Sequence, residues 1–295
     1  MSEGHKSTNA AGLAFAVGSA FAFGTLAISA KLGYREGAAP TALLAARFAT
    51  AAVLLVVLRL VQSRKQKPAR GQIVKLAILG GVAYALESSL FFAALENASA
   101  AVVTLVFYSF PLWTSLLAIA FRLEPFRSQL FIALGLAGVG IAVIFSSPLT
   151  GTKGPLLALG AAIAVAVYFV AFQVVAKGVE PVASALWTSA GAALGTAAAL
   201  PFVDHDLPVS ALPAGLALGL ASAIAFALLY AAIARIGSAR SSVAATMEPV
   251  ATVVLAAIFL DETITWRVVV GAVLVVSALP VLALTAPPRP EAPGP

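Results

Sequence analysis

Residues 91–126 read FFAALENASAAVVTLVFYSFPLWTSLLAIAFRLEPF, and residues 229–264 read LYAAIARIGSARSSVAATMEPVATVVLAAIFLDETI. The two stretches align without a gap at an offset of 138 residues. Identical pairs include Ala93 with Ala231, Pro111 with Pro249, Thr114 with Thr252 and Glu124 with Glu262. The chain therefore contains an internal repeat, and the orientation of the two copies decides the fold.

The composition is that of a membrane protein. Hydrophobic residues make up 61% of the 295 positions, and only 10% are charged, whereas charged residues are about 25% of an average soluble domain. So few charges could not cover the surface of a soluble fold of this length, so lipid must cover much of it. We expect an all-α integral membrane protein, with the bilayer as its surroundings.

Several chemistries are excluded or disfavoured by the residue types. Cysteine is absent, and the two histidines, His5 and His205, lie outside the hydrophobic segments. Disulfides, thiolate metal sites and cysteine nucleophiles are therefore excluded, and a histidine-based zinc site is not expected. No Walker motif is present, so ATP does not drive the protein directly. We expect no metal and no cofactor.

Hydropathy divides the chain into ten apolar segments of about the 20 residues that a bilayer requires. The repeat supports the two weakest boundaries, at 96–97 and at 237–238, because they fall at equivalent places. The ten segments lie at about 12–33, 41–62, 73–95, 98–121, 128–146, 154–177, 182–203, 211–235, 239–260 and 266–285.

Lysine and arginine predict the orientation. With a cytoplasmic N-terminus, thirteen basic residues fall on the cytoplasmic side and four on the other, Lys31, Arg35, Lys153 and Arg267, while Arg47 lies within a segment. This bias follows the positive-inside rule and places both termini in the cytoplasm. The basic run 59–75 could instead bind anionic lipid or nucleic acid, but topology is the favoured interpretation. The net charge of +6 thus reflects topology, and no nucleic-acid partner is expected.

The two copies are predicted to be inverted. Five helices separate each residue from its partner, and an odd number makes equivalent helices cross the bilayer in opposite directions. We expect two five-helix repeats, 1–150 and 151–295, that together form one membrane domain. Inverted repeats suit alternating access, in which the halves exchange conformations around a central site. The alternative is that duplication only builds a stable bundle.

The stretch MEPVATVVLAAIFLDETITWRVVVGAVLVV resembles the signature of the EamA family in the drug/metabolite transporter superfamily. Its matching positions are Glu248, Pro249, Glu262 and Gly271, and Arg47 resembles an arginine typical of the family's second helix. Nearly the whole chain, roughly 12–285, is covered. The resemblance implies ten helices, cytoplasmic termini and a central cavity. Within the superfamily the chain is similar to bacterial amino-acid exporters, which implies the bacterial inner membrane.

Polar and aromatic side chains inside the segments are candidates for lining this cavity, because such residues usually face the bundle interior. Several recur at helical spacing on a single face. The alternative is that they form hydrogen bonds between helices and only stabilise the bundle. The candidates are Tyr84, Glu87, Ser88, Phe91, Thr104, Tyr108, Tyr168, Phe172, Gln173, Tyr230, Thr246 and Glu248.

Glu87 and Glu248 have about half a helix on either side, and three roles are open to them. Either acid could bind and release protons, recognise a substrate ammonium, or form an intramembrane ion pair. Lys31 and Arg47 are the candidate cations for such a pair.

Pro111 and Pro249 are predicted to lie in helix interiors, where each would kink its helix. Because the kink recurs in both copies we expect a hinge, and the alternative is a static kink. Gly191 and Gly195 are spaced to allow close packing of helices, and Gly138 and Gly140 belong to the same class.

The favoured function is a secondary transporter that exports or exchanges small organic metabolites, above all amino acids, including aromatic ones. Efflux of drugs or other metabolites by the same fold is the main alternative. A membrane-embedded enzyme would have to rely on carboxylates, lysine and hydroxyls alone, so we do not expect one. The expected partners are a small-molecule substrate and lipid. The oligomeric state is open, and a monomer would suffice.

Overall fold

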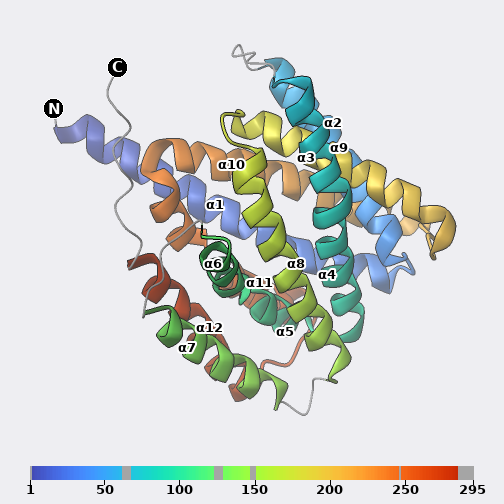
Figure 1. Cartoon of the computed structure of the whole chain (residues 1–295). Coiled ribbons are helices and arrows are strands. Elements are labelled where there is room, and N and C mark those ends of the chain that lie inside the picture. Colours follow the sequence, from blue (N-terminus) through green and yellow to red (C-terminus); the bar gives the residue numbers. More distant parts are fainter. Residues whose placement is uncertain (1, 62–67, 123–128, 147–150, 246, 285–295) are drawn as a thin grey trace.

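The computed structural model describes residues 2–61, 68–122, 129–146, 151–245 and 247–284, and every regular element among them is helical (Figure 1). In chain order these elements are α1 (Ser2–Arg35), α2 (Pro40–Val61), α3 (Arg70–Leu79), the π-helical turn η1 (Gly80–Tyr84), α4 (Ala85–Asn97), α5 (Ala100–Phe107), α6 (Phe110–Ala120), α7 (Gln129–Phe145), α8 (Lys153–Val175), α9 (Pro181–Ala199), the 3-10 turns η2 (Leu200–Phe202) and η3 (Val209–Ala211), α10 (Leu212–Ala245), α11 (Met247–Phe259) and α12 (Trp266–Leu284).

Six stretches of the described residues are long and apolar enough to cross a bilayer. Two shorter apolar helices, Met247–Phe259 and Trp266–Ser277, accompany them. The all-helical membrane fold is thus confirmed, whereas the number of ten spans stays a prediction. Large apolar side chains on the outer surface, such as Val57, Leu60 and Val61, are more than half exposed, as expected for residues that face lipid.

The sequence repeat is also a repeat of helices. Shifted by 138 residues, α2 would cover 178–199, and α9 covers Pro181–Ala199. The same shift carries α6 onto α11 and α7 onto α12. The pairing of helices follows the repeat as well, since α1 packs on α10 and α11, while its counterpart α8 packs on α4 and α6. These exchanged pairings are those of a pseudo-two-fold axis.

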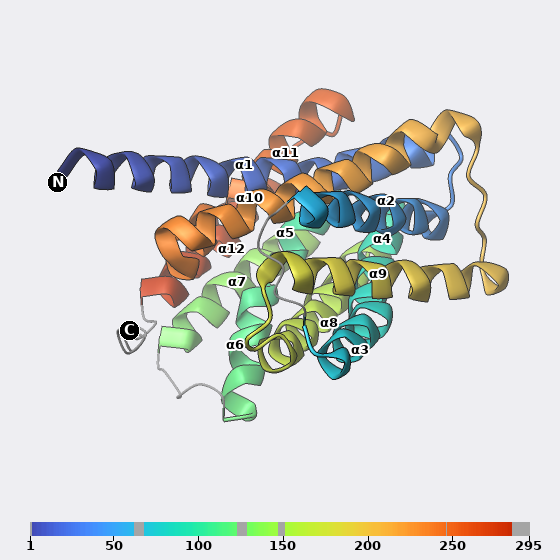
Figure 2. The same ribbon diagram turned by 90° about the horizontal axis from the view of Figure 1, so that it is seen from above.

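Equivalent helices run antiparallel, as an inverted repeat requires. Arg59 near the C-terminal end of α2 forms an ion pair of 2.7 Å with Glu180, which immediately precedes α9. Leu55 of α2 packs on Val182 just inside α9. In α7 and α12, which lie side by side in both views (Figures 1 and 2), Ile144 near the end of α7 meets Gly271 near the start of α12.

Connections predicted to lie on the non-cytoplasmic side gather at one end of the bundle. The amide of Ala39, between α1 and α2, donates to the carbonyl of Asp206, between α9 and α10, at 2.8 Å. Arg35, Ser99 and Glu262 line one hollow at this end. At the opposite end, Arg59 meets Glu180, and the Gln72 side chain donates to the carbonyl of Lys177. The predicted sorting of connections to two ends therefore agrees with the fold.

The predicted interruption at Gly237-Ser238 is wrong, because α10 continues to Ala245. In the first copy, the chain breaks where the Ser99 side chain accepts from the Val102 amide and starts α5. Position 99 corresponds to Gly237, which has no hydroxyl to cap a new helix. A Gly-Ser pair favours bending instead, and Figure 1 shows the orange end of α10 turning towards α11.

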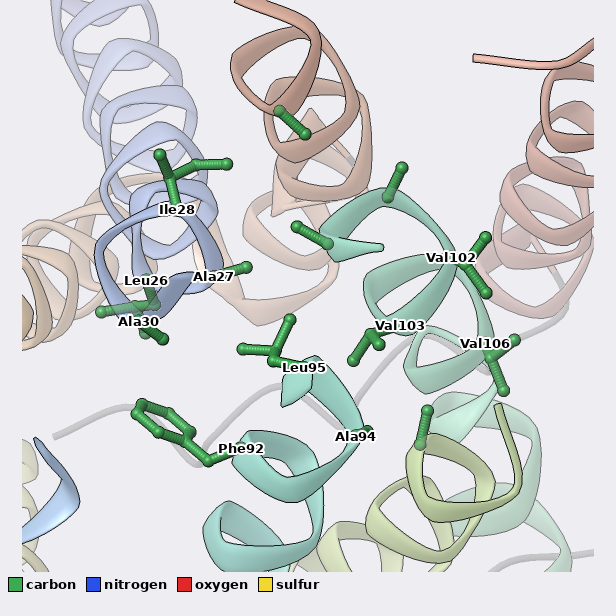
Figure 3. Close-up of a cluster of buried hydrophobic side chains, with 14 of the residues drawn as sticks. Leu26, Ala27, Ile28, Ala30, Phe92, Ala94, Leu95, Val102, Val103 and Val106 are labelled. Atoms are coloured by element: carbon green, nitrogen blue, oxygen red, sulfur yellow. The ribbon is translucent and has the colours of Figure 1, made fainter. Parts of the chain in front are cut away.

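The core surrounds α5. All residues of α5 from Ala100 to Val106 are buried, in contact with helices of both halves, among them α4, α8, α11 and α12. Figure 3 shows Leu95 of α4 between Val103 of α5 and the α1 residues Leu26, Ala27 and Ile28, with Phe92 beside it. An eight-residue helix is marginal on its own, so its packing and the contacts at its ends stabilise it.

Candidate functional site

The first repeat contains a helix break just before Pro111. α5 ends at Phe107 and α6 begins at Phe110. The prediction that Pro111 kinks a helix interior is wrong, since it lies in the first turn of α6, where its missing N–H would have no intrahelical partner. Its counterpart Pro249 lies in α11, and the kink there stays a prediction because Thr246 lies outside the described residues.

A hydrogen bond joins the two repeats near these prolines. Tyr108 forms the C-terminal cap of α5, and its hydroxyl donates to Oε2 of Glu248 at 2.7 Å. Glu248 directly precedes Pro249 in α11. The bond therefore crosses from one repeat to the other beside the helix break of the first repeat.

Arg47 of α2 binds equivalent residues of the two repeats. Its Nε donates to the Ser222 hydroxyl at 3.0 Å, and its Nη2 donates to the Tyr84 hydroxyl at 3.1 Å. Positions 84 and 222 are 138 residues apart, so they match in the repeat. The guanidinium also lies 5.1 Å from the centroid of Phe48 and 5.8 Å from that of Phe92, within the range of cation–π attraction. Arg47 is only 6% exposed.

Two carboxylates share this region with Arg47. Glu87 of α4 is 5% exposed and accepts a hydrogen bond of 2.8 Å from Ser88. Both Glu87 and Glu248 are close enough for electrostatic attraction to Arg47. Among the described residues, however, no ion pair within 4.0 Å joins Arg47 to either acid. One buried cation and two acids thus lie near each other, with their hydrogen bonds made to hydroxyl groups.

Aromatic rings surround these charges. Tyr84 stacks on Tyr168 of α8 with centroids 5.1 Å apart, and Tyr168 lies 5.5 Å from Phe172. Phe91 meets Phe107 at 5.0 Å. Faces of this kind bind organic solutes with apolar or aromatic parts.

Most of the predicted cavity residues occupy this one region. They come from η1, α4, α8, α11 and the end of α5, and the contacts given above join them. The residues that lie together in this way are Tyr84, Glu87, Ser88, Phe91, Tyr108, Tyr168, Phe172 and Glu248. Thr104 is buried in α5, and its hydroxyl has no hydrogen-bond partner in the described part of the chain. Gln173 and Tyr230 lie in α8 and α10, but their side chains are outside the description, as is the whole of Thr246.

The predicted cation Lys31 lies elsewhere. It lines a hollow of about 570 Å³ at the end of the bundle, with Tyr34, Arg35, Leu95, Glu96, Ser99, Leu260 and Glu262. Its nearest electrostatic attraction is to Glu262, not to Glu87 or Glu248. The expected intramembrane pairs of Lys31 or Arg47 with an acid are therefore not formed among the described residues. Lys31 is near the end of α1, and the sequence does not show how deep that end lies.

The profile of the EamA-like transporter family matches residues 10–146 and again 152–284. The chain belongs to the EamA-like transporter family. It is thus a multi-pass membrane transporter of the drug/metabolite type, with a small-molecule substrate. One solved crystal structure is similar over 93% of this chain and 97% of its own, with a TM-score of 0.65 and 22% sequence identity, which shows a shared fold. No curated protein matches the chain at a significant level.

In this EamA-like protein, the contacts of Arg47 with Ser222, Phe48 and Phe92 were not predicted from the sequence. Ser222 could have been found, because it is the repeat counterpart of Tyr84. The two phenylalanines carry no signal of their own in a chain with 17 of them. Within the part of the chain that the structure describes, no three or more His, Asp or Glu side chains are grouped so that they could hold a metal ion.

Proposed function

We propose that this protein is a secondary transporter that exports or exchanges amino acids, aromatic ones included, by alternating access. The observation that carries the proposal is a set of charges, the buried Arg47 and Glu87 and the half-buried Glu248, which lie near each other without an ion pair. A zwitterion complements such a set, because its carboxylate can take a guanidinium fork and its ammonium can take a carboxylate. The stacked rings of Tyr84 and Tyr168 suit an aromatic side chain.

Thr104 supports a polar solute in the same region. A buried hydroxyl without a partner is costly, and such groups are rare in folded proteins. The Thr104 hydroxyl lies one turn before Tyr108, which binds Glu248. We assign it a hydrogen bond to the solute.

The proposed cycle exchanges the conformations of the two halves, 1–150 and 151–295, with Pro111 and Pro249 as hinges. The helix break before Pro111 can change its angle without disrupting hydrogen bonds in a helix interior, which makes it a suitable hinge, and Pro249 is its repeat counterpart. The positive-inside bias places both termini in the cytoplasm, and we assign the protein to a bacterial inner membrane. A monomer is sufficient for this cycle.

The test is exchange by purified protein in liposomes. Liposomes loaded with L-phenylalanine are offered a panel of labelled amino acids and cationic drugs, with and without a pH gradient. We expect exchange of several amino acids, with aromatic ones favoured. If no amino acid is exchanged but a drug is taken up, the amino-acid proposal is wrong. Drug efflux, the second function that an aromatic interior supports, would then replace it.

Variants of the two acids test the site. Glu87→Gln and Glu248→Gln should each lower amino-acid exchange at least about tenfold, because a lost hydrogen bond to a charged group costs about 1.5–3 kcal/mol. Glu180→Gln is the matched control, since Glu180 pairs with Arg59 away from the site and should exchange normally. Wild-type rates in both interior variants would show that neither acid recognises the solute.

A further inference from the structure

Helix α5 is held at both ends by acids of the other repeat. At its N-terminus, Glu262 accepts from the Ala100 amide through Oε1 at 2.6 Å and from the Ala101 amide through Oε2 at 3.2 Å. At its C-terminus, the Tyr108 hydroxyl donates to Glu248 at 2.7 Å. Each of these contacts therefore joins an end of α5 to a carboxylate of the second repeat.

The two acids lie at opposite ends of α11. Glu248 is in its first turn, and Glu262 follows its last residue, Phe259, by three positions. Helix α11 therefore spans α5 end to end, in the antiparallel sense, and each end of α5 is fastened to it. Because α5 is short and buried from Ala100 to Val106, it can move as a rigid unit.

Glu262 also borders the hollow that Lys31 lines. Ser99, which precedes α5, and Leu260 and Glu262, which follow α11, form part of its wall. Arg35 of α1 donates to the carbonyl of Leu260 at 2.8 Å. Leu95, which is fully buried, lines the same hollow and lies between α1 and Val103 of α5 (Figure 3).

We propose that Glu262 is a positioning residue of the transport cycle. By binding the N-terminus of α5, it keeps the Lys31 end of the bundle closed, and through α5 it holds Tyr108 on Glu248 in the central site. A change at Glu248, when solute binds or leaves, is then transmitted along α5 to the closed end. The role in transport rests on the proposed function, whereas closure of this end by Glu262 does not.

The absence of cysteine provides a direct test of closure. Leu95→Cys gives the chain a single thiol, and its reaction with a water-soluble maleimide reports the opening of the hollow. In the purified full-length protein, well below its melting temperature, adding Glu262→Ala should raise the labelling rate at least about tenfold, which corresponds to about 1.4 kcal/mol. Glu262→Gln, which keeps one acceptor oxygen, should raise it less.

Glu96→Ala is the matched control, because Glu96 lines the same hollow but is exposed and does not bind α5 in the structure. Added to the Leu95→Cys protein, this change should leave the rate of maleimide labelling within about twofold of its value without the change. Leu260→Cys is a second reporter in the same wall, should Leu95→Cys fail to fold. Equal labelling in the Glu262→Ala and Glu96→Ala proteins would overturn the closure.

Coupling along α5 is tested by Tyr108→Phe, which releases the far end of the helix. In the Leu95→Cys protein it should also speed labelling, and combining it with Glu262→Ala should add little, because both changes free the same unit. Labelling unaffected by Tyr108→Phe, or strictly additive effects, would overturn the coupling. Neither result depends on which solute is carried, so a failed transport assay leaves this test intact.

Discussion

At the scale of single residues, Arg47 has the central position. It reaches Tyr84 of the first repeat and Ser222 of the second from one guanidinium, and its own repeat counterpart is Ala185. The site is therefore asymmetric although the scaffold is symmetric. Only a planar side chain with several donors can bind both hydroxyls while it lies against aromatic rings.

Arg47→Lys should lower both exchange and thermal stability. Lysine keeps the charge, but its ammonium cannot reproduce the two directed bonds, so we expect at least about a tenfold loss of exchange, equivalent to about 1.4 kcal/mol. Arg59→Lys is the control, because its pair with Glu180 needs only a point charge. Exchange and melting temperature are measured for both variants, and identical behaviour of the two would contradict the role given to Arg47.

Thr104→Val should separate function from stability. Replacing the partnerless hydroxyl by a methyl group of similar size removes a desolvation cost of about 1–3 kcal/mol, so the melting temperature should rise while exchange falls. The comparison is Thr196→Val, where the lost hydroxyl donates to the Ala192 carbonyl at 2.8 Å and stability should decrease. A drop in melting temperature for Thr104→Val would show that its hydroxyl is satisfied in the protein.

At the scale of elements, the predicted close packing at Gly191 and Gly195 is confirmed. A Cβ at Gly191 would overlap the carbonyl of Ala77 in α3, and one at Gly195 would overlap Gly81 in η1. The same prediction holds for Gly140, whose Cβ would meet the Gly271 carbonyl at 2.9 Å, and fails for Gly138, whose Cβ would meet no described atom within 4 Å. Sequence spacing identifies small residues, but only the packed helices show which of them are in contact.

Gly191→Ala should therefore destabilise the protein by about 1–3 kcal/mol, as overpacking does. Gly138→Ala adds the same methyl group where there is room, and it should be neutral or stabilising because alanine favours helix. Thermal unfolding in detergent, followed by fluorescence, compares the two. A larger loss of stability at position 138 than at 191 would contradict the packing of α9 on α3 and η1.

At the scale of the whole molecule, the repeat and the charge distribution agree with each other. Equivalent helices are antiparallel, and the connections are sorted to two ends of the bundle as predicted. Helix α10 departs from the predicted helix boundary, because Gly237 replaces the capping Ser99 of the first copy. Where the local capping chemistry differs between the copies, the symmetry of the helix boundaries is lost.

The orientation of this bundle can be tested with fusions. The bias of thirteen basic residues to four predicts a cytoplasmic C-terminus, so green fluorescent protein fused there should fluoresce. Alkaline phosphatase inserted between Asp204 and His205, in an exposed connection at the Lys31 end, should be active, because it would reach the non-cytoplasmic side. Activity of the phosphatase at the C-terminus instead would reverse the assigned orientation.

The membrane class, the helical repeat, its inversion and the family resemblance could all be predicted from the amino-acid sequence. They follow from composition, hydrophobic periodicity and the 138-residue offset, which are properties of the linear chain. The folded structure was needed to show that Arg47 meets Tyr84 and Ser222, that Tyr108 meets Glu248, and that Glu262 caps α5. Such contacts join helices far apart in sequence, so they depend on how each helix is rotated and packed against its neighbours, which no local pattern specifies.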